Sequence, residues 1–492
     1  MPQPETVPVF IGGEWQASSA TDTSPVYNPS DGTQIAATPM GDATEVGRAI
    51  EAAHAAFPEW AETPAVDRAR VLFAFKQLLE DHFEELSQIV TREHGKTLEE
   101  SRGSVRRGIE VVEFACGAPS LLMGESLENI ARGIDCDTIR QPLGVSVAIS
   151  PFNFPVMVPL WTLPVAIACG NTFVLKPSEK VPLSAIRMIE LLEEAGCPKG
   201  VVNLVHGGKG AVDTLLTHPD VRTVSFVGST PIAKYVYETA TRAGKRVQSA
   251  GGAKNYMIVL PDADVDSTID AVMGSAYGCA GERCMAGSVL VCAEDAGSRF
   301  LDPLSDAARK MRVGPTDRDP DSQMGAVVTR QHLESLHASI EEGLREGAEL
   351  FVDGRDVKVE GAPDGFYLGP TVFDKVQPNM SIARNELFGP VLSVMHTDDL
   401  QGAVERCNNS GFGNAAVLFT SSGAAARTFR HHVNAGMVGI NVGVPAPMAF
   451  FPFSGWNNSF FGDLHVQGHE GVSFFTRQKV TINRWIDTKR YF

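Results

Sequence analysis

Long apolar runs are missing from this chain of 492 residues. No stretch reaches the roughly 18 apolar residues that a membrane-spanning helix needs. The most apolar segment, residues 156–169, is interrupted by Pro159 and Pro164. The first ten residues, MPQPETVPVF, lack a basic region followed by an apolar core, so we expect no secretory signal. The sequence therefore predicts a protein without a membrane partner.

Positive charge is also scarce. The chain has 42 Lys and Arg against 59 Asp and Glu, a formal net charge of −17. No basic field would attract a phosphate backbone or an anionic membrane, so the composition argues against a general nucleic-acid binder. An anionic small substrate would need local arginines to overcome the global charge.

Cysteine is sparse as well. Eight cysteines are too few for a disulfide scaffold in a chain of this length, and none forms a CxxC pair. We therefore expect free thiols in a reducing cytoplasm, without the common zinc or redox spacings. His465 and His469 are the other candidate metal ligands, but Gly468 lies between them and a polar loop is the favoured interpretation. No metal site is predicted.

The chain shows no internal repeat, and short apolar runs alternate with helical patterns instead. Apolar residues at three- and four-residue steps predict one amphipathic helix over residues 65–94. Strands are expected at 145–149, 172–175, 201–205, 221–227 and 256–260, with helices at 183–194 and 232–242. A second series has strands at 288–292, 391–395 and 416–420 and helices at 296–311 and 400–408. This alternation predicts two α/β domains with parallel sheets, meeting near Gly251 and Gly252.

The end of the chain has a different pattern. Residues 475–485 alternate apolar and polar side chains and predict an exposed strand. Because an unpaired strand edge at a terminus favours pairing with another subunit, we expect self-association.

Three segments carry candidate functional residues. Gly228 and Ser229 lie between a strand and a helix, where backbone N–H groups can bind a phosphate; an ordinary turn is an equal alternative, and no GxGxxG fingerprint is present. Glu179 follows another strand and could accept the hydroxyls of an adenosine ribose, although a solvated charge is commoner. Cys284 lies among small residues beside Arg283, whose charge would favour a thiolate; a buried, inert cysteine is the alternative.

Six motifs occur in a fixed order along the chain. They are PFNFP (151–155), KPSE (176–179), FVGST (226–230), GERC (281–284), NELFGP (385–390) and PFSG (452–455). In this order they resemble the aldehyde dehydrogenase superfamily across essentially the whole chain. Within it, the sequence is similar to the CoA-acylating methylmalonate and malonate semialdehyde dehydrogenases. That closer similarity rests on GAKN (252–255), ERCMA (282–286), RGIE (107–110) and GVPAPMAFFPFSGW (443–456).

The resemblance implies an α/β fold of the aldehyde dehydrogenase type, with two parallel-sheet domains and a small oligomerisation β-extension. An NAD-binding domain would comprise residues 1–123 and 143–252, and a catalytic domain with the nucleophilic cysteine would comprise 253–448. Residues 124–142 and 472–492 would be oligomerisation strands, and 449–471 a return segment. The family also implies a homotetramer.

The resemblance assigns roles by position. Cys284 matches the nucleophile that attacks the aldehyde carbon, and Asn153 matches the side chain that stabilises the oxyanion together with the Cys284 backbone N–H. The cofactor-binding positions are Lys176 and Glu179 for the adenosine ribose, Gly228 and Ser229 for the pyrophosphate turn, and Glu386 for the nicotinamide ribose. Phe152 is a further cofactor-binding position. A thiohemiacetal would form, hydride would pass to NAD, and an acyl-enzyme thioester would remain.

Departures from the wider superfamily are informative. Hydrolytic members carry a glutamate four residues before the lysine that Lys254 matches, where this chain has Ala250. Water attack on the thioester should then be slow, and the family's acceptor is coenzyme A, whose thiol (pKa about 8.5) is partly ionised at neutral pH. Arg283 and Arg107 match residues that bind the substrate carboxylate; without the resemblance, Arg107 would be interpreted as a surface arginine. Ala233 replaces a glycine in the first turn of the phosphate-binding helix.

The resulting hypothesis is NAD-dependent, CoA-acylating oxidation of a 3-oxo acid, malonate or methylmalonate semialdehyde. Loss of CO2 would give acetyl-CoA or propionyl-CoA. A hydrolytic semialdehyde dehydrogenase using Glu282 or Glu386 as base, and a cysteine acyltransferase without redox chemistry, stay open. One methyl group changes discrimination by only about 1–3 kcal/mol, so the sequence does not choose between the two semialdehydes.

Overall fold

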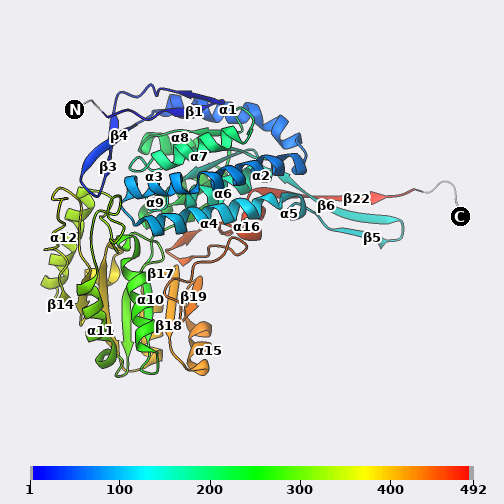
Figure 1. Ribbon diagram of the computed structural model, residues 1–492. Coiled ribbons are helices and arrows are strands. Elements are labelled where there is room, and N and C mark those ends of the chain that lie inside the picture. Colours follow the sequence, from blue (N-terminus) through cyan, green and yellow to red (C-terminus); the bar gives the residue numbers. More distant parts are fainter. Residues whose placement is uncertain (1–3, 487–492) are drawn as a thin grey trace.

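The computed structural model describes residues 4–486, which form two α/β units and a projecting arm (Figure 1). Residues 1–3 and 487–492, which belong to the expected N-terminal domain and to the expected oligomerisation strand, lie outside the described residues. No helix between residues 4 and 486 is both long and apolar enough to cross a bilayer. All eight cysteines are free thiols.

The first unit is built on an eight-stranded sheet in the order β2-β1-β9-β8-β7-β10-β11-β21. Its strands are β1 (Val9–Ile11), β2 (Glu14–Gln16), β7 (Val145–Ile149), β8 (Thr172–Lys176), β9 (Val202–Leu204), β10 (Val221–Val227), β11 (Arg246–Ala250) and β21 (Phe460–Phe461). The five strands from β9 to β11 are parallel. Every residue of β7 and β8 is buried, as expected of parallel strands with helices on both faces.

Helices cover this sheet and include those that position the site. They are α1 (Ala43–Glu62), α2 (Ala65–Asp81), α3 (Phe83–His94), α4 (Leu98–Cys116), α5 (Ala118–Leu121), α6 (Met157–Ala168), α7 (Leu183–Glu194), α8 (Lys209–Thr217) and α9 (Thr230–Arg242). A hairpin of β3 (Thr23–Asn28) and β4 (Thr33–Pro39) lies at the side of the unit and extends toward the second unit (Figure 1).

The second unit has a seven-stranded sheet in the order β14-β15-β16-β13-β12-β18-β19, parallel except for β14. Its strands are β12 (Asn255–Val259), β13 (Gly287–Ala293), β14 (Glu349–Val352), β15 (Thr371–Asp374), β16 (Val391–Thr397), β18 (Ala415–Phe419) and β19 (Met437–Ile440). Its helices are α10 (Val265–Tyr277), α11 (Gly297–Lys310), α12 (Arg330–Arg345), α13 (Ser381–Arg384), α14 (Leu400–Asn408) and α15 (Gly423–His432), with the 3-10 turn η1 (Gly278–Gly281). Short strands β17 (Phe412–Gly413) and β20 (Trp456–Asn457) and helix α16 (Gly468–Phe474) complete the fold. The predicted fold class is confirmed; the domain boundaries stay a prediction.

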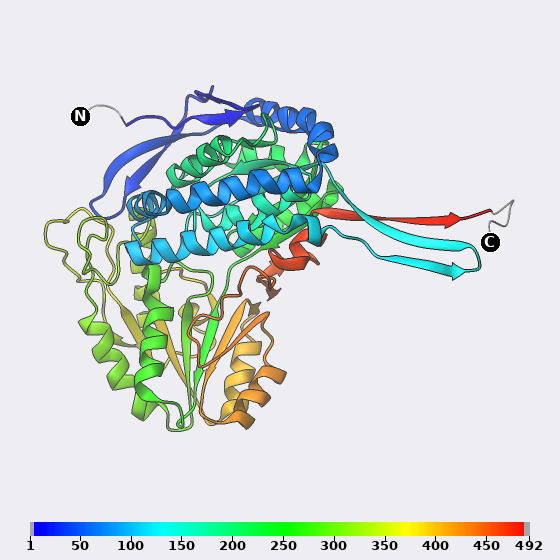
Figure 2. The same ribbon diagram turned by 45° about the vertical axis from the view of Figure 1, so that its right-hand side comes forward.

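The arm is a three-stranded antiparallel sheet in the order β22-β6-β5, and it extends well beyond the two units (Figure 2). It consists of β5 (Ser126–Ala131), β6 (Ile134–Pro142) and β22 (Thr476–Arg484). The strand expected at 475–485 is therefore present, but it is not wholly unpaired, because one edge pairs with β6 of the same chain. Apolar side chains on the arm are exposed, among them Leu127, Val480 and Ile482.

The single helix expected over residues 65–94 is wrong, because the chain forms α2 and α3 with a break at His82. Leu79 and Phe83 keep the four-residue step across the break, so the apolar pattern runs on without interruption. His82 leaves the helical region (φ −104°, ψ 18°), and Glu84 and Glu85 then occupy the first turn of α3, where acidic side chains favour a helix start.

One of the apolar clusters spans both units. Met285, Ala415 and Met437, from the side of the second sheet, are buried in the same apolar cluster as helices α2, α4 and α6 of the first unit. Phe453, from the segment that returns to the first unit, packs on Trp161 of α6 with 4.7 Å between ring centroids. The junction between the units is therefore a packed interior, and the candidate site lies there.

Candidate active site

The carboxyl ends of the parallel strands of the first unit meet along one edge of the sheet. The chain passes from β7 to β8 and β9 on one side and then returns to β10 on the other side of β7. Ligands of open α/β sheets bind in the crevice at such a reversal. A cavity of about 550 Å³ lies there. It is lined by Met40, Ile149, Ser150, Lys176, Ser178, Glu179, Gly207, Gly208, Lys209, Val212, Phe226, Val227, Ile232 and Tyr235.

Polar groups in this cavity suit a nucleoside. Lys176 is buried at the end of β8; its Nζ donates to the Pro177 carbonyl (2.7 Å) and lies 3.7 Å from Glu179 Oε2. Burial lowers the pKa of Lys176, against the opposing effect of Glu179. The Glu179 side chain is 34% exposed, so its carboxylate can accept sugar hydroxyls. These residues fit the adenosine half of a dinucleotide.

The turn before α9 offers backbone donors to a phosphate. Ser229 is the N-cap of α9, and within residues 4–486 its side chain does not cap the first-turn amides. Gly228 packs against the Phe226 ring, where an added Cβ would lie 2.5 Å from a ring carbon, so the turn requires glycine. Ala233, which replaces a glycine of many family members, buries its methyl group in the apolar cluster beneath α9.

The nucleophile candidate Cys284 follows a strained turn. Cys279 and Ala280 both have φ of 52°, in the left-handed region that costs non-glycine residues on the order of 1–3 kcal/mol each. The Cys284 carbonyl accepts hydrogen bonds from the side-chain amides of Asn255 and Asn414, both at 2.8 Å. These two amides fix the backbone at Cys284.

A second cavity, of about 300 Å³, brings Cys284 together with both predicted carboxylate-binding arginines. It is lined by Glu100, Gly103, Ser104, Arg107, Glu110, Val111, Phe154, Met157, Trp161, Cys279, Arg283, Cys284, Met285, Val444, Ala446, Pro447, Ala449, Phe453 and Gln467. Asn153 does not line this cavity. It is buried, and its neighbour in sequence, Phe154, is the residue of this segment that lines the cavity.

The two arginines differ in how far protein groups already engage them. Arg107 Nη1 donates to Glu110 Oε2 (3.0 Å) one turn along α4 and lies 2.8 Å from Met448 Sδ. Arg283 donates to the carbonyls of Gly274 and Ser275 near the end of α10. Its Nε is buried and has no hydrogen-bond partner among residues 4–486.

The remaining cofactor candidates, Phe152 and Glu386, line neither of these two cavities. Phe152 packs edge-on against Phe388, with 5.7 Å between centroids, and stacks with His94. Glu386 is partly buried, and its Oε1 accepts a hydrogen bond from the Ala253 backbone N–H (2.9 Å). Burial raises the pKa of Glu386 to about 7, against the lowering effects of the Ala253 amide and Lys254.

Both carboxylates that line the Cys284 cavity already have protein partners. Glu110 is paired with Arg107, and Glu100 accepts backbone N–H groups with both oxygens. Ala250 at the end of β11 has no ionisable group. Glu282 does not line the cavity; it lies 3.9 Å from His94 Nε2 and 3.8 Å from His332 Nε2. Burial raises the pKa of Glu282 to about 8.

Burial also shifts the pKa of the candidate nucleophile, the Cys284 thiol. It raises the pKa of Cys284 to about 12; Glu386 acts in the same direction, and Arg283 only partly opposes both. The thiolate favoured by Arg283 in the sequence argument is therefore outweighed by desolvation. We expect the rate of Cys284 alkylation by iodoacetamide, in cofactor-free enzyme, to rise about tenfold per pH unit from pH 7 to 9. Mass spectrometry of the alkylated peptide measures this rate, and a plateau between pH 7 and 8 would contradict the shift.

The histidines weighed as metal ligands have other partners. His465 Nδ1 lies 2.9 Å from Glu470 Oε2, and its Nε2 lies 3.2 Å from the Gly455 carbonyl. His469 packs edge-on against Phe114. Across residues 4–486, no group of three or more His, Cys, Asp or Glu side chains is placed to hold a metal ion.

Some residues that hold the site escaped the sequence argument. Asn414 supports Cys284 although it belongs to none of the six motifs, and Asn255 had been noted only as part of GAKN. Lys96 and Glu100 contact the Asn153 and Cys279 backbones. The pattern Thr97-x-x-Glu100 is a readable helix-start signal, whereas nothing in the sequence marks Lys96 as buried.

The aldehyde dehydrogenase family model matches residues 15–481, a range that includes the Cys284 cavity and the crevice at the strand reversal. The chain belongs to the aldehyde dehydrogenase family. A malonate-semialdehyde dehydrogenase of Halalkalibacterium halodurans is 50% identical to it over 476 residues, 97% of this chain and 98% of the relative. Malonate-semialdehyde dehydrogenase 1 of Geobacillus kaustophilus is 49% identical over 485 residues, 98% and 99% of the two chains.

Solved structures agree with this assignment. Methylmalonate-semialdehyde dehydrogenase of Oceanimonas doudoroffii matches with a TM-score of 0.96 and 46% identity, over 98% of this chain and 99% of the other. A Sinorhizobium meliloti protein provisionally given the same name, complexed with NAD, matches with a TM-score of 0.97 and 44% identity over 99% of both chains. The resemblance predicted from the motifs is confirmed.

Proposed function

We propose that this aldehyde dehydrogenase oxidises malonate or methylmalonate semialdehyde with NAD and transfers the acyl group to coenzyme A. Loss of CO2 would give acetyl-CoA or propionyl-CoA. The observation that carries the proposal is the cavity that Cys284, Arg107 and Arg283 share, in which the lining carboxylates are already engaged. The names of the relatives at about 50% identity support the substrate class.

The residues supply a consistent sequence of steps. The Cys284 sulfur attacks the aldehyde carbon, and the Asn153 side chain and the Cys284 N–H stabilise the negative oxygen that forms. Lys176, Glu179, Ser229 and Glu386 would hold NAD, which accepts a hydride when bound. Cys284 is then left as a thioester.

The arginines explain why a carboxylate substrate would be chosen. A planar guanidinium binds a carboxylate through two parallel hydrogen bonds, and Arg283 has a buried donor without a protein partner. Loss of the carboxylate as CO2 leaves its electron pair in a thioester enolate, with negative charge on the oxygen, and the enolate then takes up a proton from water at its α-carbon. The donors that stabilised the first oxyanion would stabilise the enolate oxygen as well.

The fate of the thioester decides between the acylating and the hydrolytic reactions. Because Ala250 provides no base, we expect NADH formation to stop after about one turnover per active site without coenzyme A, and to continue when it is added. NADH absorbance measures the turnover, and mass spectrometry identifies the product. Equal steady rates with and without coenzyme A, with a free acid as product, would establish the hydrolytic enzyme instead.

Two further outcomes have definite meanings. Thioester exchange without any NADH signal would identify a cysteine acyltransferase and overturn the redox proposal. Product analysis with each semialdehyde separately would show whether the extra methyl group is accepted.

We further propose a homotetramer assembled through the exposed apolar face of the β5–β6–β22 arm.

A further inference from the structure

The short connection between α3 and α4 carries a buried lysine that contacts the Asn153 segment. Lys96 is 1% exposed, and its Nζ donates to the Asn153 backbone carbonyl. The same ammonium lies 4.0 Å from the centroid of the Phe154 ring. Lysine is rarely buried without a partner, because the desolvated charge is costly. Here both of its contacts are to the segment that carries the proposed oxyanion donor.

Four residues later, Glu100 contacts the other side of the site. Its Oε1 accepts a hydrogen bond from the Cys279 N–H at 2.6 Å. Cys279 begins the left-handed turn that leads to Cys284, so this carboxylate stabilises a backbone conformation that is otherwise unfavourable. Glu100 Oε2 accepts from the Thr97 N–H (2.9 Å), and Thr97 Oγ1 accepts from the Glu100 N–H (3.2 Å).

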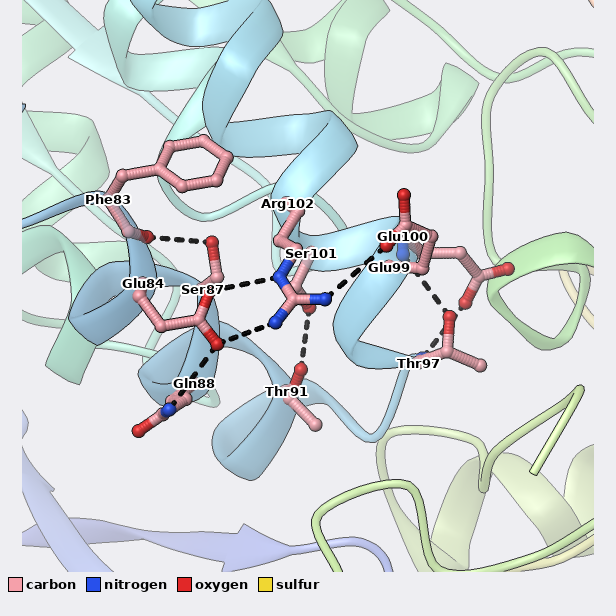
Figure 3. Close-up of polar contacts among 10 residues, drawn as sticks. All are labelled: Phe83, Glu84, Ser87, Gln88, Thr91, Thr97, Glu99, Glu100, Ser101 and Arg102. Atoms are coloured by element: carbon pink, nitrogen blue, oxygen red, sulfur yellow. Dashed lines mark hydrogen bonds and ion pairs between the residues drawn. The ribbon is translucent and has the colours of Figure 1, made fainter. Parts of the chain in front are cut away.

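The helices that carry these residues are joined to each other. Figure 3 shows the reciprocal Thr97–Glu100 bonds and, beside them, the Thr91 and Ser101 hydroxyls at 2.8 Å across the α3–α4 junction. On the outside, Arg102 donates to both oxygens of Glu84 of α3 at 2.8 and 2.9 Å. A connection fixed in this way can transmit a defined geometry to both segments that it contacts.

We propose that Lys96 and Glu100 are positioning residues that together set the separation between Asn153 and the Cys284 backbone N–H. Neither acts on substrate: Lys96 is enclosed, and both Glu100 oxygens are bound to backbone N–H groups. The two donors of the oxyanion hole come from segments about 130 residues apart in sequence, and this connection contacts both. The inference rests on the proposed roles of Cys284 and Asn153, but not on coenzyme A or on a carboxylate substrate.

A double-mutant cycle with propanal tests the proposal, since any aldehyde forms the same oxyanion. We expect Lys96→Met to slow the first turnover of NADH formation 10- to 100-fold while KM for propanal changes less than threefold. In an Asn153→Ala background, the same substitution should slow it less than twofold, because the donor that Lys96 positions is already gone. Alkylation of Cys284 by iodoacetamide, which forms no oxyanion, should stay within twofold in Lys96→Met.

Substitutions of Glu100 provide a second test, and one of them, Glu100→Gln, is expected to preserve the fold. Glu100→Gln keeps an acceptor oxygen for the Cys279 N–H and should retain at least a third of the rate, whereas Glu100→Ala should lose about tenfold in kcat at unchanged KM. If Lys96→Met does not fold, Lys96→Gln replaces it in the same double-mutant cycle. Because glutamine keeps an N–H donor, we expect a smaller loss in the rate of the first turnover. Loss of equal size in Glu100→Gln and Glu100→Ala would contradict the role of Glu100.

Lys245 supplies the matched control. It is buried in the same unit, 7% exposed, and its Nζ donates to the His218 and Val221 carbonyls away from the site. Lys245→Met should lower Tm as Lys96→Met does, with an unchanged first turnover. Equal losses of rate for Lys96→Met in both backgrounds, or a comparable loss in Lys245→Met, would overturn the proposal. If the wild-type enzyme does not oxidise propanal, the same cycle is measured with malonate semialdehyde, which forms the same oxyanion. Cys284→Ala enzyme that still oxidises the aldehyde would instead disprove the proposed function.

Discussion

Replacement of Cys284 by alanine should abolish NADH formation, with a loss on the order of 10⁴-fold or more, as for the removal of other enzymatic nucleophiles. The reason is that the hydride can leave only after sulfur has added to the aldehyde carbon. Within residues 4–486, the carboxylates that line the cavity are bound to other groups, so none replaces the thiol. Rapid-mixing absorbance at saturating substrate measures the first turnover directly.

A second buried cysteine, Cys407, is the control that separates loss of the reacting thiol from loss of packing. Cys407 on α14 is 4% exposed and belongs to the core of the second unit, away from the cavity that Cys284 lines. Cys407→Ala should lose stability as a buried side chain is truncated, but keep its first turnover within about twofold. A burst of NADH in Cys284→Ala would show that another residue is the nucleophile.

Arg107→Leu should reduce kcat/KM for malonate semialdehyde roughly 30- to 150-fold and leave propanal almost unchanged. Two charge-assisted hydrogen bonds to a carboxylate, partly exposed to solvent, correspond to about 2–3 kcal/mol. The loss should be mainly in KM, because the carboxylate is bound before and during the reaction. Arg107→Lys should recover only part of it, since an ammonium lacks the planar pair of donors.

Arg102 is the control on the same helix. It pairs with Glu84 and Glu99 at the surface and does not line the cavity (Figure 3). Arg102→Leu should leave both substrates unaffected. Arg283 is a poorer test, because its removal also unpairs the Gly274 and Ser275 carbonyls. Equal effects of Arg107→Leu on both aldehydes would show that Arg107 has a structural role only.

Regular elements whose apolar period ends at a clear boundary were predictable from the sequence. Helix α7 (183–194), strand β10 (221–227) and helix α14 (400–408) have the predicted limits. The break at His82 was not predictable, because no glycine or proline marks it and the apolar spacing continues. The pairing of β22 with β6 was not predictable either, since it joins segments more than 330 residues apart.

The candidate site also contains residues that were predictable from the sequence and residues that were not. The sequence placed Glu179 and the turn at Gly228 after strands, and the parallel pairing of β7 with β8 and β10 brings the ends of these strands to one edge of the sheet. The buried role of Lys96 could not be read from the sequence, because lysine is usually exposed and its partner Asn153 is 57 residues away. Only the packing of α4 against α6 brings the two segments together.

The interior that joins the two units has a consequence for how reactants exchange. Swinging the units apart like a hinge would expose Met285, Met437 and Phe453, at about 1.5–3 kcal/mol for each side chain. Opening the units as a hinge is therefore costly, and we expect reactants to reach and leave Cys284 while the two units stay packed together.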